Sequence, residues 1–229
     1  MKKILGIVFL LCSLQAQANI VINGTRVIYP ETNKSVLVQL VNNGDAPSLV
    51  QAWIDDGDIN STPETADVPF LLSPPVVKVN VNNGQQLRIE KQASELPSDR
   101  ESVFYLNVLD IPPTPEHLKD KNTLQLAIKS RIKMFYRPSK LVKGADKAIN
   151  QLLLKASGKN LTVTNNSPYY ITVASLSEST RESLIDSFMI APFSQEAVSA
   201  KQVVKNNKQY KIVYIDDFGA YLSKDILIQ

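Results

Sequence analysis

Few residues in this 229-residue chain are of the types that carry enzyme chemistry at neutral pH. The sequence holds one histidine, His117, and one cysteine, Cys12, so it cannot assemble a catalytic triad or a typical zinc site. His117 follows a proline-rich segment and has no partner spaced around it, so we expect a solvated loop residue. Phosphate loops, nucleophile elbows and dinucleotide fingerprints are absent from the sequence. We therefore predict no enzyme activity, no catalytic or metal-binding residue and no cofactor.

The most informative segment is 124–138, in which an apolar half precedes a cationic half. Three apolar residues alternate at its start, and three cations then alternate on the opposite parity. They are Leu124, Leu126 and Ile128, followed by Lys129, Arg131 and Lys133. One interpretation of the long strand predicted over 124–136 is an edge strand whose lysines prevent aggregation. The other is an edge kept open to accept another chain.

The rest of the chain has the period-two pattern of β-strands, with turn residues such as those at 42–45 between short apolar runs. A spacing near ten residues indicates β-sandwiches, and we expect no convincing amphipathic helix. Further strands are expected over 20–28, 35–41, 49–54, 76–81, 86–90, 102–108, 151–156, 160–164, 170–174, 188–190, 209–214 and 220–227. Pro138 should end the long strand, and a polar, basic stretch follows over 139–147. The prediction is therefore two all-β domains, 19–138 and 139–229.

Residues 1–18 have the features of a secretory signal: a basic start, an apolar run over 4–12 and the cleavage pattern Ala16-Gln17-Ala18. We expect the mature chain to begin at Asn19 and to carry no membrane anchor, because no later segment approaches ~20 continuous apolar residues. The chain has 25 Lys and Arg against 22 Asp and Glu, and two of the lysines belong to the leader. The mature protein is then nearly neutral, which predicts no nucleic acid partner.

The segment 96–112 carries a recognisable motif, Leu-Pro-Ser-Asp-Arg-Glu-Ser-Val-Phe-Tyr-Leu-Asn-Val-Leu-Asp-Ile-Pro. It resembles the signature of periplasmic pilus chaperones, the family of the P-pilus and type 1 pilus chaperones. Supporting blocks lie at 51–54, 129–138, 166–173 and 214–220, so the resemblance covers both halves of the chain. The short connection over 113–123 and the absence of cysteine from the mature chain resemble the short-loop branch. The implied fold is two immunoglobulin-like β-sandwiches in an L shape.

The resemblance also implies three groups of functional residues. The first is a donor strand lent to an incomplete subunit, the second a pair of cations that binds the subunit's terminal carboxylate, and the third an ion network between the domains. The implied residues are Leu124, Leu126 and Ile128 for the donor strand, Arg26 and Lys133 for the anchor, and Glu101, Arg137 and Asp217 for the network.

These residues imply a periplasmic chaperone whose partners are pilus subunits and an outer-membrane usher, and which is not embedded in the membrane. A different class, a fimbrial subunit or sugar-binding adhesin, usually has a single incomplete sandwich, a disulfide and an N-terminal donor extension. This chain instead begins at once with the strand expected over 20–28. The 22 carboxylates leave a two-acid glycosidase open by residue type, but two domains of about 100 residues offer little of the deep cleft it needs.

Overall fold

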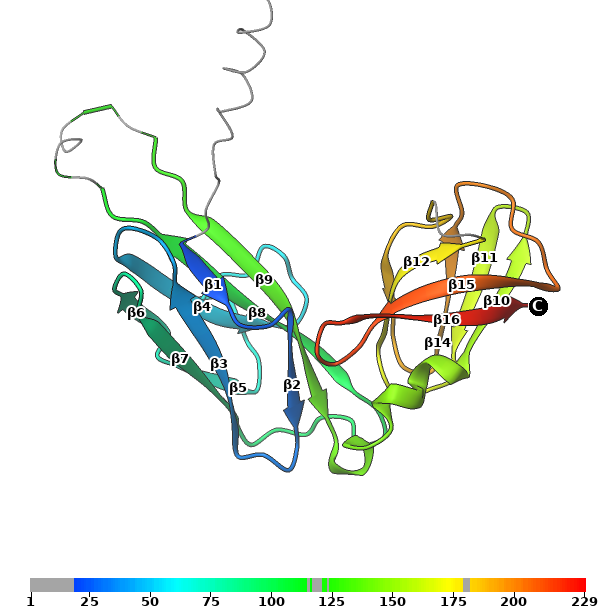
Figure 1. The fold of residues 1–229 in the computed structure, drawn as a ribbon. Coiled ribbons are helices and arrows are strands. Elements are labelled where there is room, and N and C mark those ends of the chain that lie inside the picture. The colour runs from blue at the N-terminus through cyan, green and yellow to red at the C-terminus, as the bar shows by residue number, and fades with distance from the viewer. Residues whose placement is uncertain (1–18, 115, 117–120, 123, 179–181) are drawn as a thin grey trace, which may run out of the picture.

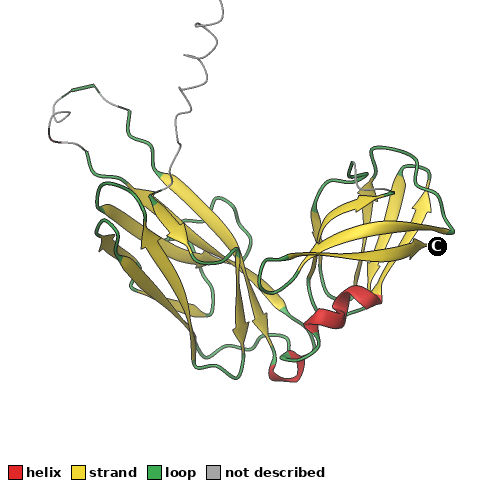
Figure 2. Cartoon of the chain, in the orientation of Figure 1, coloured by secondary structure: helices red, strands yellow, loops and turns green. Residues whose placement is uncertain are grey.

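The structure, a computed structural model, describes residues 19–114, 116, 121–122, 124–178 and 182–229. Two β-sandwiches meet at one end and diverge in an L shape (Figure 1). Figure 2 shows that strands dominate both sandwiches and that the two short helices of the connecting segment lie between the last strand of the first sandwich and the first strand of the second. The predicted all-β fold of two immunoglobulin-like domains is confirmed. The predicted leader, residues 1–18, and His117 lie outside the described residues.

The N-terminal sandwich packs a four-stranded sheet against a five-stranded sheet. The first sheet has the order β1 (Ile20–Ile22), β3 (Ser35–Asn42), β7 (Gly84–Lys91) and β5 (Phe70–Ser73). The second has the order β2 (Arg26–Pro30), β9 (Ile128–Arg137), β8 (Ser102–Ile111), β4 (Ser48–Asp55) and β6 (Val76–Val79). Neighbouring strands are antiparallel except β2 and β9, which pair in parallel.

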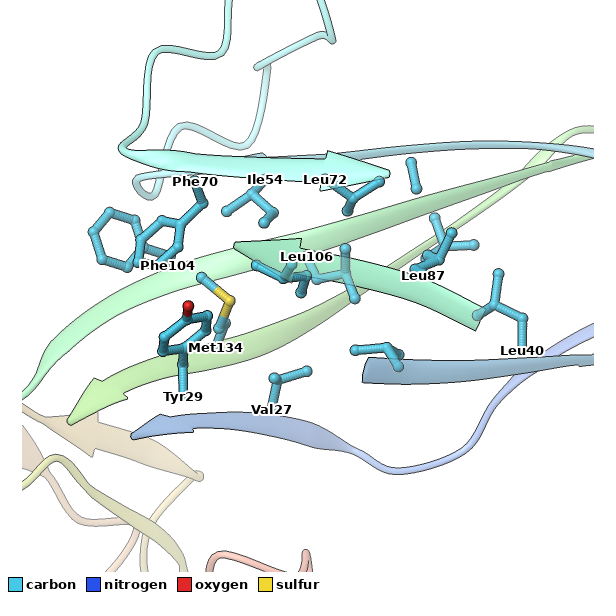
Figure 3. Packing of buried hydrophobic residues seen from close by; sticks show 14 of the residues in the cluster. Val27, Tyr29, Leu40, Ile54, Phe70, Leu72, Leu87, Phe104, Leu106 and Met134 are labelled. Carbon is cyan, nitrogen blue, oxygen red and sulfur yellow. The ribbon is translucent and has the colours of Figure 1, made fainter. Parts of the chain in front are cut away.

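Every second side chain of each inner strand points into the space between these two sheets, as a period-two apolar pattern requires. Leu87 and Ile89 of β7 have no exposed surface. Figure 3 shows Phe70, Phe104 and Tyr29 beside Met134, and the Phe70 and Phe104 rings lie edge to face with centroids 4.8 Å apart. Because Met134 belongs to β9, the second half of that strand is anchored in the core.

The C-terminal sandwich has a three-stranded sheet and a four-stranded sheet. Their orders are β10 (Leu152–Ser157), β11 (Asn160–Asn165) and β14 (Ser194–Ser199), and β13 (Phe188–Ile190), β12 (Ile171–Ser177), β15 (Lys208–Ile215) and β16 (Tyr221–Ile228). Leu154, Leu161 and Ile212 lie in its separate core. The strands β5 and β14 were not expected: β5 has only four residues, and β14 is a mostly exposed edge strand without an apolar alternation.

Three further elements differ from the sequence prediction. The strand predicted over 20–28 is two strands, because a turn containing Gly24 at φ +119° moves the chain from one sheet to the other. The strand predicted over 124–136 begins only at Ile128, because β8 ends at Ile111 and leaves 124–127 without a neighbouring strand. The polar stretch after Pro138 contains two short 3-10 helices, η2 (Ser139–Leu141) and η3 (Ala145–Gln151). Helices this short carry no recognisable amphipathic period.

Candidate functional site

Three charged residues implied for the interdomain network lie in direct contact. Arg137, the last residue of β9, donates from Nε to Glu101 Oε1 at 2.7 Å. Its Nη1 and Nη2 donate to the two carboxylate oxygens of Asp217 at 2.7 and 2.8 Å. Since Asp217 follows β15, this bidentate pair joins the N-terminal sandwich to the C-terminal one.

Glu101 adds two backbone contacts across the same junction. Its Oε2 accepts a hydrogen bond from the Tyr170 N–H at 2.8 Å, and its own N–H donates to the Pro168 carbonyl at 2.9 Å. Burial alone would lower the pKa of Arg137, but its hydrogen bonds to Asp217 and the charges of Glu101 and Asp217 outweigh burial and raise that pKa. The arginine therefore remains charged, and the junction has an internal counterion for it.

Arg26 and Lys133 occupy the same register position of two adjacent strands. Arg26 is the first residue of β2, and the parallel pairing places it opposite Lys133 of β9. Neither cation forms an ion pair with a carboxylate of the described residues. They line one cleft of about 220 Å³ between the domains, together with Thr25, Thr172 and other residues.

The environment of these two cations disfavours their charge. Burial lowers the pKa of Lys133, and the positive charge of Arg26 lowers it further. Burial also lowers the pKa of Arg26, against the opposing charges of Asp217, Asp216 and Glu101. Arg26 donates from Nη1 to the Ile215 carbonyl at 3.3 Å, and its Nε is buried without a partner among the described residues. Two like charges that share a position, with no carboxylate of the described residues in ion-pair contact, form a site suited to an anion.

The other two cations of the alternating row, Lys129 and Arg131, have acceptors of their own. Lys129 donates to the Ile59 carbonyl at 3.1 Å, and the Arg131 Nε donates to Asp55 Oδ2 at 3.2 Å. The guanidinium of Arg131 also lies 3.7 Å from the ring centroid of Tyr105. Of these three cations, only Lys133 has a side chain that makes no hydrogen bond or ion pair with other described residues. Sequence reasoning missed the role of Asp55, because Asp55 and Arg131 are paired only by the fold.

Half of β9 presents an unpaired edge. On one side β8 pairs with Ile128 through Tyr136, whereas on the other side β2 pairs only from Lys133 onward. Within the described residues, 128–132 therefore have no strand on the β2 side. The anchor cations lie where this open edge ends.

The apolar row predicted at the start of the segment becomes steadily more exposed along the chain away from the core. On β9, Met134 is buried and Ile128, of the same parity, is 51 % exposed. Leu126 and Leu124, which precede the strand, are 69 % and 87 % exposed. An exposed apolar row beside an unpaired strand edge is a liability in a protein that works alone.

The described residues contain no group of three or more His, Cys, Asp and Glu side chains placed to hold a metal ion. In the same part of the chain, no helix is long and apolar enough to cross a membrane.

Comparison with known proteins agrees with the fold. Residues 19–142 match the family described as "Pili and flagellar-assembly chaperone, PapD N-terminal domain", and residues 147–226 match "Pili assembly chaperone PapD, C-terminal domain". The probable fimbrial chaperone YehC of Escherichia coli is 42 % identical over 226 residues, which cover 99 % of this chain and 94 % of YehC.

Two solved structures have the same architecture. The Pseudomonas aeruginosa chaperone CupB2 has a TM-score of 0.78 at 33 % identity, covering 91 % of this chain and all of CupB2. The chaperone SafB, solved in complex with the Salmonella enterica pilin SafA, supports the fold with a TM-score of 0.76 at 24 % identity, covering 93 % of this chain and 97 % of the matched one. The chain therefore belongs to the PapD family of pilus-assembly chaperones.

Proposed function

We propose that this chaperone binds pilus subunits in the periplasm by lending them the open edge of β9 and by holding their terminal carboxylate between Arg26 and Lys133. The observation that carries the proposal is the position of the two unneutralised cations at the end of the open edge. One bound strand can satisfy both features. Its carboxylate neutralises the cations while its backbone pairs with the free N–H and C=O groups of 128–132.

The geometry sets the direction of the bound strand. A strand whose carboxylate lies at Lys133, and whose remaining residues extend along the open edge toward Leu124, runs in the same direction as β9. It is therefore parallel to β9 and continues the line of β2, which is itself parallel to β9. The subunit strand and β2 would then occupy successive parts of one edge.

The apolar row supplies the hydrophobic part of the interaction. Leu124, Leu126 and Ile128 would fill the groove of a subunit that lacks its last strand, at about 1.5 to 3 kcal/mol for each fully buried side chain. Each backbone hydrogen bond along the edge adds about 0.5 to 1.5 kcal/mol. These contributions support a stable complex after the cost of association is included.

Further parts of the proposal follow from family membership and from the leader. The related chaperone SafB was solved with a pilin, which supports a pilus subunit as partner. We propose that the leader is removed after Ala18, that the domains divide near residue 138, and that the loaded chaperone delivers its subunit to an outer-membrane usher. Glu101, Arg137 and Asp217 would hold the two domains at the angle that forms the cleft. A fimbrial subunit or adhesin, which usually has a single sandwich, is the less favoured alternative, since this chain forms two.

The test replaces each anchor cation by alanine and measures binding of the cognate pilus subunit, which is sought among the genes beside that of the chaperone. Arg26→Ala or Lys133→Ala should weaken binding about 10- to 150-fold, because each removes a charge-assisted hydrogen bond contributing about 1.5 to 3 kcal/mol. The melting temperature should change little, since neither cation has an ion-pair partner in the described fold.

Matched controls are Arg88→Ala and Lys78→Ala, which remove exposed cations from β7 and β6. These controls should bind the subunit as tightly as wild type does. If the two anchor variants also bind like wild type, the carboxylate does not lie between Arg26 and Lys133.

A further inference from the structure

The hairpin between β15 and β16 reaches across the junction to the turn that precedes β2 (Figure 1). Its Ile215 carbonyl accepts the hydrogen bond from Arg26, and its Asp217 holds Arg137. Arg26 has no other hydrogen-bond acceptor in the described part of the chain. The guanidinium of this N-terminal residue is therefore oriented by the backbone of the C-terminal domain.

The hairpin also approaches the other domain closely at Gly219. A Cβ added to Gly219 would lie far inside van der Waals contact with Thr25 Oγ1 and only 3.5 Å from Thr25 Cβ. Gly219 also has a φ of +82°, which side-chain-bearing residues rarely adopt. Thr25 directly precedes Arg26. Because Gly219 has no side chain, the hairpin can lie against this part of the chain beside the anchor.

The hairpin tip has little freedom to absorb an added atom. The Asp216 side chain accepts hydrogen bonds from the N–H groups of Phe218 and Ala220, at 2.9 and 2.8 Å. The Gly219 N–H donates to the Asp216 carbonyl at 3.1 Å, and the Asp216 N–H donates to the Ala220 carbonyl at 3.0 Å. Where the exposed Thr25 hydroxyl does not rotate aside, a side chain at position 219 would shift the tip, and with it the adjoining Ile215 carbonyl, away from Arg26.

We propose that Gly219 is a positioning residue for the carboxylate anchor: it lets the C-terminal hairpin approach closely enough to hold Arg26 toward the subunit's terminus. The proposal rests on the proposed function of Arg26 and Lys133. It adds that the affinity for the carboxylate, and not only the domain angle, depends on the contact between Gly219 and Thr25.

The test compares two synthetic peptides with the C-terminal sequence of the pilus subunit encoded beside the gene, one ending in a free acid and one in an amide. Binding to the full-length mature protein is measured by titration calorimetry. The ratio of the two affinities isolates the contribution of the carboxylate. In wild type the acid should bind at least about 10-fold more tightly, from one or two charge-assisted hydrogen bonds.

Gly219→Ala should reduce this ratio at least about 5-fold and leave affinity for the amide near the wild-type value. The matched control is Gly158→Ala, because Gly158 also has a positive φ, +64°, but has open space around its Cβ position. Gly158→Ala should cause the same kind of backbone strain, from a side chain at positive φ, and should keep the wild-type ratio of acid to amide affinity. Adding Thr25→Ala to Gly219→Ala should restore the ratio, since it removes the clashing hydroxyl.

Two outcomes overturn the inference. If Gly219→Ala keeps the wild-type ratio, or if Gly158→Ala lowers it equally, Gly219 does not position the anchor. Should Gly219→Ala fail to fold, Thr25→Leu decides, because it enlarges the same contact from an exposed residue and should also lower the ratio. A wild-type ratio near one would instead overturn the anchor itself, and the role of Gly219 with it.

Discussion

Replacing Leu124, Leu126 and Ile128 by alanine one at a time distinguishes a donor edge from a folding core. Their exposed fractions in the free chaperone are 87 %, 69 % and 51 %. The exposed part of each side chain is the area that a subunit can still bury, whereas the buried part already stabilises the chaperone. From Leu124 to Ile128, the loss of binding affinity caused by each substitution should therefore decrease, and the loss of unfolding free energy should increase.

The expected sizes follow from the exposed fractions. Each substitution removes the equivalent of three methylene groups, or about 2.4 kcal/mol for a fully buried side chain. Scaling by exposure predicts that binding weakens by ~2.1, ~1.7 and ~1.2 kcal/mol at Leu124, Leu126 and Ile128, which is ~30-, ~20- and ~8-fold in affinity. The free energy of unfolding should fall by the remainder, ~0.3, ~0.7 and ~1.2 kcal/mol.

Affinity is measured by titrating the pilus subunit encoded beside the gene, and stability by chemical denaturation of each free variant. The matched control is Leu71→Ala, since Leu71 is 53 % exposed on β5, at the edge of the other sheet. It should lose stability like Ile128→Ala and retain full binding. Equal binding losses for Leu71 and Leu126, or the largest stability loss at Leu124, would refute the assignment of this row to the subunit.

Two further predictions concern the charged groups. Because burial and Arg26 lower the pKa of Lys133, affinity for the free-acid peptide should fall as pH rises, beginning below the ordinary titration range of a lysine. For Lys133→Arg, the affinity measured by calorimetry should not change over the same pH range. A wild-type affinity that is independent of pH in this range would contradict the role of Lys133. Arg137→Ala should lower the free energy of unfolding by about 3 to 5 kcal/mol, because it leaves the Glu101 carboxylate buried and unpaired. Asp217→Asn should cost at most about 1 kcal/mol, since Asp217 is partly exposed, and equal losses in denaturation would contradict this account.

Sequence periodicity predicted the fold class and the parity of the long segment, since both depend on which residues alternate. Met134 is buried on the same parity as the exposed Ile128, and Lys133 lies on the other, as the alternation requires. Periodicity did not predict that the strand begins at Ile128, because a β-strand also needs a neighbour, and β8 ends too early to provide one. The pattern at 124–127 is that of a strand whose partner is absent from the described chain.

The contacts that build the site depend on residues far apart in sequence. Arg137 and Asp217 are separated by 80 positions, and no local pattern pairs them; their association was expected only from the family resemblance. The pairing of Arg131 with Asp55, and the Ile215 carbonyl that holds Arg26, were not expected at all. A backbone carbonyl leaves no signal in residue type, and an aspartate on one strand does not indicate which arginine it will meet.

The free chaperone maintains two unfavourable features along one edge: an apolar row in water over 124–128, and a pair of cations, Arg26 of β2 and Lys133 of β9, without an ion-pair partner among the described residues. A strand that ends in a carboxylate and has alternating apolar residues relieves both, but only in one register. A shift by one residue would turn the polar face of that strand toward the row. A shift by two would restore the faces but displace the carboxylate by about 6.6 Å, beyond hydrogen-bond reach of Arg26 and Lys133. In the proposed complex the two cations would therefore select the register in which the apolar row is used.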